Sequence, residues 1–309
     1  MTHPPILPLS NPNNKIINVC EKIGELSLKL ANPDSVQFFC VTIDSCEFDY
    51  ASLNQCLRQS IAYYVFSRLK MESYDKNNDL SASGIDAIEF LRDSTNSKDK
   101  GAGAELGEIL LYLFLEGVLN APKLLSKVEL KTSSNMYING WDGVHLLFNP
   151  AVSSYQLIYG ESKIRISLTD SINDAFDSIS NFKISGTSDI SLINSQILNE
   201  TIKKEDAEFI RSLIIPSQNI SQQFPIDKAF GIFLGYSFEL KDRNKMKNID
   251  CRNEIKKKIQ SDIESILPSL QEKIKKYKLE NHSFYVYILP FNDAQMDRSD
   301  IINKLMVRK

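Results

Sequence analysis

The order of apolar segments in the second half of this 309-residue chain constrains its fold more than any other feature. Residues 104–119 carry apolar side chains at helical spacing, which predicts a helix. Three strand-like runs separated by turn-type residues follow this helix, at 126–132, 141–148 and 155–166. The same patterns predict two more helices and two more strands, at 170–182, 203–215, 229–240 and 283–289. We therefore expect an α/β fold of the α+β type, in which a mixed central sheet is flanked by helices.

The N-terminal region is expected to form a smaller α/β domain. Helical spacing predicts a helix over residues 15–30, and the apolar run 36–43 predicts a buried strand. The polar stretch 94–101 is the expected boundary between domains. We expect residues 1–95, with a partner-binding role, and residues 96–309 each to have a hydrophobic core of their own.

A basic segment lies near the C-terminus. Residues 241–278 hold 12 Lys or Arg against 6 Asp or Glu, in a chain whose net charge is −3. Apolar residues keep a helical rhythm through this segment, and Pro268 is expected to divide it into two helices. The basic side chains could neutralise DNA phosphates, or they could form the solvated face of paired helices. The sequence leaves both interpretations open.

The sequence lacks the features of several other protein classes. No stretch approaches the roughly 18 uninterrupted apolar residues that a membrane span requires. Neither a GxxxxGK loop nor a GxGxxG loop is present, so we expect no nucleotide binding by this chain. The five cysteines show no CxxC spacing and no nearby histidine cluster. We expect them to be buried or free thiols in a cytoplasmic protein.

Two neighbouring strand-like runs carry residues suited to metal-dependent chemistry. Side chains alternate between the two faces of a strand, so Glu161 and Lys163 project from the same side. Asp142 lies at the start of the preceding run, and an antiparallel hairpin would bring the two acids together. Phosphodiester hydrolysis uses a divalent ion, and hard ions prefer carboxylate oxygens. We therefore predict that Asp142 and Glu161 hold Mg²⁺ or Mn²⁺.

Lys163 and an acid from the preceding helix complete the expected catalytic set. Lys163 would offset the negative charge that builds up on the phosphate, and the neighbouring carboxylates favour its charged form. Glu105 and Glu108 fall on the helix stripe opposite the apolar one, and we predict that Glu108 assists as a third metal ligand. Solvated acids are also common near a helix N-terminus, because they favour the helix dipole. Which of Glu105 and Glu108 joins the site is left open.

The Glu-x-Lys tripeptide alone is a weak signal, because it occurs four times in the sequence. The copies begin at Glu129, Glu161, Glu239 and Glu254. Only the copy at Glu161 follows an acid-bearing helix, a strand and a second strand that opens with an aspartate. The alternative interpretation is a surface ion pair on an edge strand, with Asp142 merely capping a turn.

This order of elements resembles the PD-(D/E)xK nuclease core, as found in restriction endonucleases. Asp142 stands in the place of its motif aspartate, and Glu161 and Lys163 stand as its last two residues. Trp141 replaces the proline that precedes the aspartate in that motif. The resemblance implies a metal-dependent phosphodiesterase in which these residues are catalytic.

Three segments more closely resemble the HamA family, the nuclease-like subunits of Hachiman anti-phage defence systems, which are related to AbpA. They are GAGAELGEILLYLFLEG, NGWDGVHLLF and YGESKI, at residues 101–117, 139–148 and 159–164. The resemblance implies a two-protein complex with a HamB-like helicase that restrains the nuclease. It also implies that infection releases the nuclease, which then degrades phage and host DNA.

Two other functions compete with this hypothesis. The chain could be a non-catalytic adaptor that keeps the nuclease-like fold and binds or regulates a helicase, because a fold does not guarantee its chemistry. It could also be a restriction-type enzyme that acts alone at defined sequences, although no target-reading module is evident.

Overall fold

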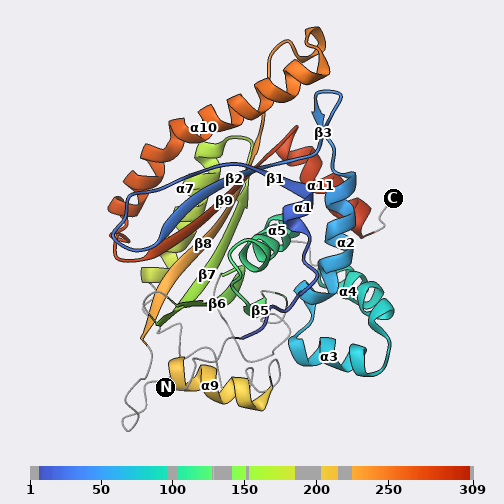
Figure 1. The fold of residues 1–309 in the computed structure, drawn as a ribbon, viewed down its shortest axis with the longest axis vertical. Helices are drawn as coiled ribbons and strands as arrows, with labels where there is room; N and C mark the ends of the chain where they lie inside the picture. Colours follow the sequence, from blue (N-terminus) through green and yellow to red (C-terminus); the bar gives the residue numbers. More distant parts are fainter. Residues whose placement is uncertain are drawn as a thin grey trace.

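The computed structural model describes residues 7–95, 103–126, 128, 141–150, 153–184, 203–214 and 225–306. Seven strands within these ranges form one mixed sheet, in the order β1-β2-β9-β8-β7-β6-β5 (Figure 1). Their bounds are β1 Cys20–Leu26, β2 Asp34–Val41, β5 Lys123–Ser126, β6 Gly143–Asn149, β7 Ser154–Ile164, β8 Ile226–Ser237 and β9 Ser283–Phe291. The expected mixed sheet flanked by helices is confirmed.

The middle of the sheet is parallel and its edges are antiparallel. Strands β2, β9, β8 and β7 run parallel to one another, whereas β1 and β6 pair antiparallel with their neighbours. Every residue of β9 is buried, because helices cover both faces of the central strands. Strand β5 ends at Ser126, and most of the strand expected at 126–132 lies outside the described residues.

Helices cover the sheet from two sides (Figure 1). On one side, α5 (Ala104–Gly117) packs on β7 and β8, with α2 (Ala51–Val65) and α11 (Ala294–Leu305) beside it. On the other side lie α7 (Leu168–Ile184) and α10 (Asn248–Lys276). The other elements are α1 Ile16–Val19, α3 Arg68–Lys76, α4 Leu80–Thr95, α9 Lys204–Ile214, the 3-10 helix η1 Arg243–Lys245 and a hairpin of β3 Ile43–Asp44 and β4 Glu47–Phe48. Within the described ranges, none of the helices is long and apolar enough to span a membrane.

Two glycines allow α5 to lie close against the sheet. A Cβ added at Gly160 of β7 would lie 2.9 Å from the Leu111 side chain. One added at Gly231 of β8 would lie 2.8 Å from the Leu115 side chain. A larger residue at either position would push the helix outward. The close approach sets the N-terminal turns of α5 against the carboxyl end of β7.

The sheet continues across the boundary expected between residues 95 and 96. Strand β2 comes from the first region and β9 from the second, and they pair from Asp34 opposite Phe284 to Phe38 opposite Ile288. Helix α2 of the first region packs against α5 of the second. This differs from the expectation of two separate cores, because buried side chains from both regions form one hydrophobic cluster. The residues of the expected boundary after 95 lie outside the described ranges, and the partner-binding role of the first region stays a prediction.

Two of the predicted helices need correction. Residues 15–30 contain the short helix α1 and then strand β1, whose backbone groups pair with those of β2. Local spacing could not reveal this long-range pairing. Helix α10 continues through Pro268 instead of dividing there. Pro268 is exposed, and the buried residues Ile263 and Leu270 hold the helix against the protein on either side of it.

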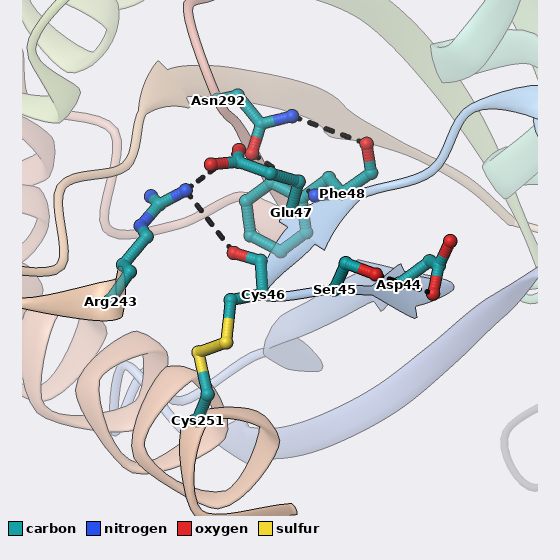
Figure 2. The surroundings of a disulfide bond; sticks show 8 residues. All are labelled: Asp44, Ser45, Cys46, Glu47, Phe48, Arg243, Cys251 and Asn292. Carbon is teal, nitrogen blue, oxygen red and sulfur yellow. Dashed lines mark hydrogen bonds and ion pairs between the residues drawn. A yellow bond between two sulfur atoms is a disulfide. The ribbon is translucent and has the colours of Figure 1, made fainter. Parts of the chain in front are cut away.

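A disulfide joins the β3–β4 hairpin to helix α10. It links Cys46 in the turn of the hairpin to Cys251 in the first turn of α10, across a sequence separation of 205 residues (Figure 2). Beside it, the Arg243 side chain donates to the carbonyl oxygen of Cys46 and, at 2.8 Å, to the carboxylate of Glu47. The remaining cysteines are buried free thiols: Cys20, Cys40 and Cys56. The expectation of thiols is therefore wrong for Cys46 and Cys251, because the fold brings together residues that the sequence separates widely.

Candidate active site

Strands β6 and β7 bring two of the predicted acids to neighbouring positions. The strands pair antiparallel with Gly143 opposite Gly160. The backbone N–H of Asp142 donates to the carbonyl oxygen of Gly160 at 2.9 Å. Asp142 therefore lies just before β6, beside Glu161 of β7, and the predicted antiparallel hairpin is confirmed.

Ser162 holds the carboxylate of Asp142 in place. The Asp142 Oδ2 atom accepts hydrogen bonds from the Ser162 backbone N–H at 2.8 Å and from the Ser162 Oγ at 2.6 Å. Asp142 is only 6% exposed, and a buried carboxylate needs such donors. Ser162 is the middle residue of the Glu-x-Lys tripeptide, a position to which the sequence pattern assigns no role. Its positioning role was not evident because the strand pattern points its side chain away from Glu161 and Lys163.

Glu161 and Lys163 form an ion pair on β7. The Lys163 ammonium donates to the Oε1 atom of Glu161. The Oε2 atom of Glu161 is buried and accepts no hydrogen bond from the residues that the structure describes. The pKa of Glu161 is raised to about 7, first by burial and then by the negative charge of Asp142, while Lys163 and the Ser178 hydroxyl oppose the shift. A cation at this position would therefore stabilise the ionised form of Glu161.

The N-terminal half of α5 adds Glu108 and places Glu105 nearby. Glu108 is 5% exposed, and its Oε2 atom accepts a hydrogen bond from the Tyr64 hydroxyl at 3.0 Å. The pKa of Tyr64 is raised well above its ordinary value, first by burial and then by Glu108, Asp142 and Glu105. Glu108, Asp142 and Glu105 therefore all lie near the buried side chain of Tyr64. Tyr64 belongs to α2, and no local sequence signal connected it with the predicted acids.

A cavity of about 150 Å³ opens beside these residues. Its polar lining consists of Glu108, Asp142, Ser162, Lys163, Arg165 and Arg298. Among the described residues, Glu105 and Glu161 lie outside this lining, although Glu161 contacts Lys163. The structure therefore brings three of the four predicted catalytic residues to one cavity and the fourth, Glu161, next to it. It also adds two arginines that the sequence analysis did not identify.

The donor set suits a hard divalent cation held by two carboxylates. The described part of the chain contains no group of three or more His, Cys, Asp or Glu residues that could hold a metal ion. Mg²⁺ is commonly bound through one or two carboxylates, with water and substrate phosphate oxygens as its other ligands. Asp142 and Glu161 are two buried carboxylates at neighbouring positions beside β6 and β7, and the Oε2 atom of Glu161 has no partner within hydrogen-bond distance among the described residues, although the Ser178 hydroxyl of α7 is near enough to lower the pKa of Glu161. The residues present therefore fit Mg²⁺ or Mn²⁺ with few protein ligands.

The other Glu-x-Lys copies lie in different surroundings. Glu239 follows β8 in a segment without regular secondary structure. Glu254 lies on α10 and forms an exposed ion pair with Lys257. The copy that begins at Glu129 lies outside the described residues. Of the copies within the described ranges, the one at Glu161 lies on a strand beside a second buried acid.

A second buried polar network lies at the other end of α5. The carboxylate of Glu116 accepts hydrogen bonds from the backbone N–H groups of Ser10, Asn11 and Lys123. Burial alone would raise the pKa of Glu116, but hydrogen bonds from the Lys123 and Asn11 backbone N–H groups and from the Ser10 hydroxyl outweigh burial and lower it. His145 is buried in the same network, and burial lowers its pKa to about 4. Glu116 therefore fixes the N-terminal segment to α5, and both Glu116 and His145 lie outside the lining of the candidate site's cavity.

The mixed sheet with flanking helices is consistent with an α+β nuclease-like core. The model of the HamA family matches residues 15–305, nearly the whole chain. This chain therefore belongs to the HamA family, and that membership supports an anti-phage role of the Hachiman type. No match was found among curated proteins.

Proposed function

We propose that this chain is the metal-dependent deoxyribonuclease of a two-component Hachiman-type defence system. The observation that carries the proposal is the pair of buried acids Asp142 and Glu161, with Lys163 in contact with Glu161, where β6 and β7 meet. Membership of the HamA family supports the anti-phage role. The resemblance to the PD-(D/E)xK core supports the nuclease chemistry.

Each residue of the site has a role that its surroundings favour. Asp142 and Glu161 would hold Mg²⁺ or Mn²⁺, with Glu108 as a further ligand. When bound, the ion would polarise the phosphate and lower the pKa of a coordinated water. Ser162 keeps the Asp142 carboxylate in position. Lys163 would stabilise the negative charge that builds up on the phosphate during attack by water.

We further propose that a HamB-like helicase restrains this nuclease, with phage and host DNA as the substrates. A non-specific nuclease that was always active would harm the cell that makes it. A partner that binds the inactive arrangement more tightly lowers the active population as far as its differential affinity allows. Abnormal DNA ends produced by infection would release the nuclease by changing that balance.

The test compares Glu161→Gln and Lys163→Ala with the matched control Glu254→Gln. Glu254 begins another copy of the Glu-x-Lys tripeptide, but its side chain is exposed on α10. In cells that also carry the helicase partner, Glu161→Gln and Lys163→Ala should abolish phage protection. In the purified complex, both should lower Mg²⁺-dependent cleavage of DNA by more than about a hundredfold. Glu254→Gln should leave protection and cleavage unchanged.

Two outcomes would support the competing functions. Full protection by both Glu161→Gln and Lys163→Ala would indicate a non-catalytic adaptor. Discrete fragments produced by the chain without the helicase would indicate a restriction-type enzyme. Removal of the metal with EDTA should stop cleavage in the proposed function, and cleavage that persists would contradict it.

A further inference from the structure

Arg298 reaches the candidate site from the last helix of the described chain. It lies on α11 and lines the same cavity as Lys163 and Asp142. Its backbone packs against Gly103 at the start of α5, where an added Cβ would lie 2.8 Å from the Arg298 carbonyl group. Gly103 also has a φ angle of +90°, which L side chains rarely adopt. This close contact fixes α11 against α5 and so sets the position from which the guanidinium extends.

The guanidinium of Arg298 is only partly satisfied by the protein. Its Nη1 atom donates to the carbonyl oxygen of Ile164 at 3.4 Å, which is long for a hydrogen bond. Its Nε atom is buried, and no acceptor among the described residues contacts it. A buried donor atom without an acceptor is unfavourable, even on a half-buried side chain. An anion entering the cavity would supply the missing acceptor.

Arg165 places a second guanidinium next to the first. It follows β7 directly, lines the cavity and also donates to the carbonyl oxygen of Ile164, at 3.2 Å. The two arginines therefore lie at the same carbonyl oxygen. Arg165 also pairs with Asp174, but both side chains are about 40% exposed, at 42% and 41%. Such an exposed ion pair is weak, so Arg165 can exchange it for another anion.

The charges of the cavity select the kind of ligand. Lys163, Arg165 and Arg298 contribute three positive charges, against the carboxylates of Asp142 and Glu108. A divalent cation bound by the acids would make the cavity strongly positive. Guanidinium groups match the oxygens of phosphate in a two-pronged arrangement that an ammonium group cannot form. A phosphate diester is the anion that a nuclease must position in such a cavity.

We propose that Arg298 and Arg165 bind a backbone phosphate of the DNA strand that is cut. This inference rests on the proposed nuclease function and assigns part of substrate binding to α11, far from the motif residues in sequence. The contact would position the strand, while Asp142, Glu161 and Lys163 carry out the chemistry.

The test measures binding of a short fluorescein-labelled DNA duplex at several salt concentrations. The full chain carries Glu161→Gln, so that binding is observed without cleavage. Adding Arg298→Ala should weaken binding about tenfold. It should also reduce the slope of log affinity against log salt by about 0.9, because one phosphate contact is lost. Arg165→Ala should act in the same direction, and Arg298→Lys should keep the slope while losing part of the affinity.

Arg58→Ala is the matched control. Arg58 also donates to a backbone carbonyl oxygen of α11, that of Lys304, but it does not line this cavity. Its substitution should leave both affinity and salt slope unchanged. If thermal unfolding shows that Arg298→Ala does not fold, the same measurement is made on Arg298→Gln, which keeps the aliphatic stem and the polarity of the side chain but not its charge.

The outcomes separate this inference from the proposed function. Unchanged affinity and slope in the Arg298 and Arg165 variants would overturn the inference, as would the absence of duplex binding at every salt concentration. A different result would overturn the nuclease function and leave the inference standing. In that case Arg298→Ala weakens DNA binding, but the wild-type chain does not cut DNA with Mg²⁺, even in the helicase complex. Cleavage that neither arginine substitution changes would overturn the inference about Arg298 and Arg165 and leave the nuclease function standing.

Discussion

Two buried residues on neighbouring strands show how burial sets the charge of a single side chain. Glu161 and His145 are each 2% exposed. Burial disfavours the charged form of both, so the pKa of Glu161 is raised to about 7 and that of His145 is lowered to about 4. The pKa of Glu161 therefore lies close to neutral pH, so a bound cation could displace the proton of its carboxyl group. His145 stays neutral and donates its Nδ1–H to the carbonyl oxygen of Ala121 at 2.8 Å.

Replacing His145 with Asn should remove part of the acid sensitivity of the fold. The ordinary pKa of 6.5 applies to the unfolded chain, whereas the folded chain has a value of about 4. Between these values the unfolded chain binds the proton and the folded chain does not, so stability falls as the pH decreases. The loss at His145 should reach up to about 3 kcal/mol. Asn keeps a donor near the Nδ1 position and does not titrate.

The measurement is urea unfolding of wild type and His145→Asn in EDTA across this pH range. The difference between the two proteins is the quantity to compare, because Glu161 acts in the opposite direction. Its raised pKa means that its contribution to stability falls as the pH rises toward 7. That contribution is common to both proteins and cancels in the difference. A difference that does not change with pH would contradict a neutral buried His145.

At the scale of elements, contacts between distant segments override local patterns. The apolar spacing of residues 15–30 is helical, yet β1 forms there because β2 offers a partner for its backbone groups. The spacing along α10 is also helical, and the packing of its buried face keeps the helix continuous through Pro268. The β3–β4 hairpin is too short to be stable alone, and a disulfide and Arg243 hold it beside α10.

Replacing Cys46 and Cys251 together with Ser should lower the free energy of unfolding by about 2–4 kcal/mol. The bond spans 205 residues, and a cross-link over so long a segment restricts the unfolded chain strongly. Urea unfolding without reductant measures this loss. Wild type should lose the same stability when dithiothreitol is added, and the double Ser variant should not respond. Equal stability of wild type with and without dithiothreitol would contradict this prediction.

At the scale of the whole molecule, the N-terminal region belongs to the same folded body as the candidate site. Strands β1 and β2 extend the sheet beyond β9 (Figure 1). Helix α2 covers α5 and supplies Tyr64, which donates to Glu108 at 3.0 Å. The site therefore depends on residues that precede the predicted domain boundary.

Residues 96–309 expressed alone should not fold cooperatively. Without β2, the buried strand β9 would become an apolar edge of the sheet, and without α2 the apolar face of α5 would be uncovered. Thermal unfolding followed by circular dichroism should show a sharp transition for the full chain and none for this fragment. A sharp transition of the fragment, with a near-ultraviolet spectrum like that of the full chain, would restore the prediction of two separate domains.

Local patterns in the sequence by themselves determined the helix α5, the strands β6 and β7 and the acids on them. Periodicity is a short-range property, so the alternation that sets Glu161 and Lys163 on one side of a strand can be read directly. The neighbouring position of Asp142 followed from a short connection between two strands. The family resemblance also came from these segments, and the family match extends it to residues 15–305.

Only the tertiary structure decided which distant residues join them. Tyr64 meets Glu108 across 44 residues, Arg298 meets Ile164 across 134, and Cys46 meets Cys251 across 205. Such contacts leave no periodic signal, because they depend on how the sheet orders its strands and on which helix covers each face. The same reason explains why β1 was predicted as a helix and why two separate cores were expected. The predicted motif of Asp142, Glu161 and Lys163 is local in this chain, whereas the cavity beside it also takes Glu108 from α5 and Arg298 from α11.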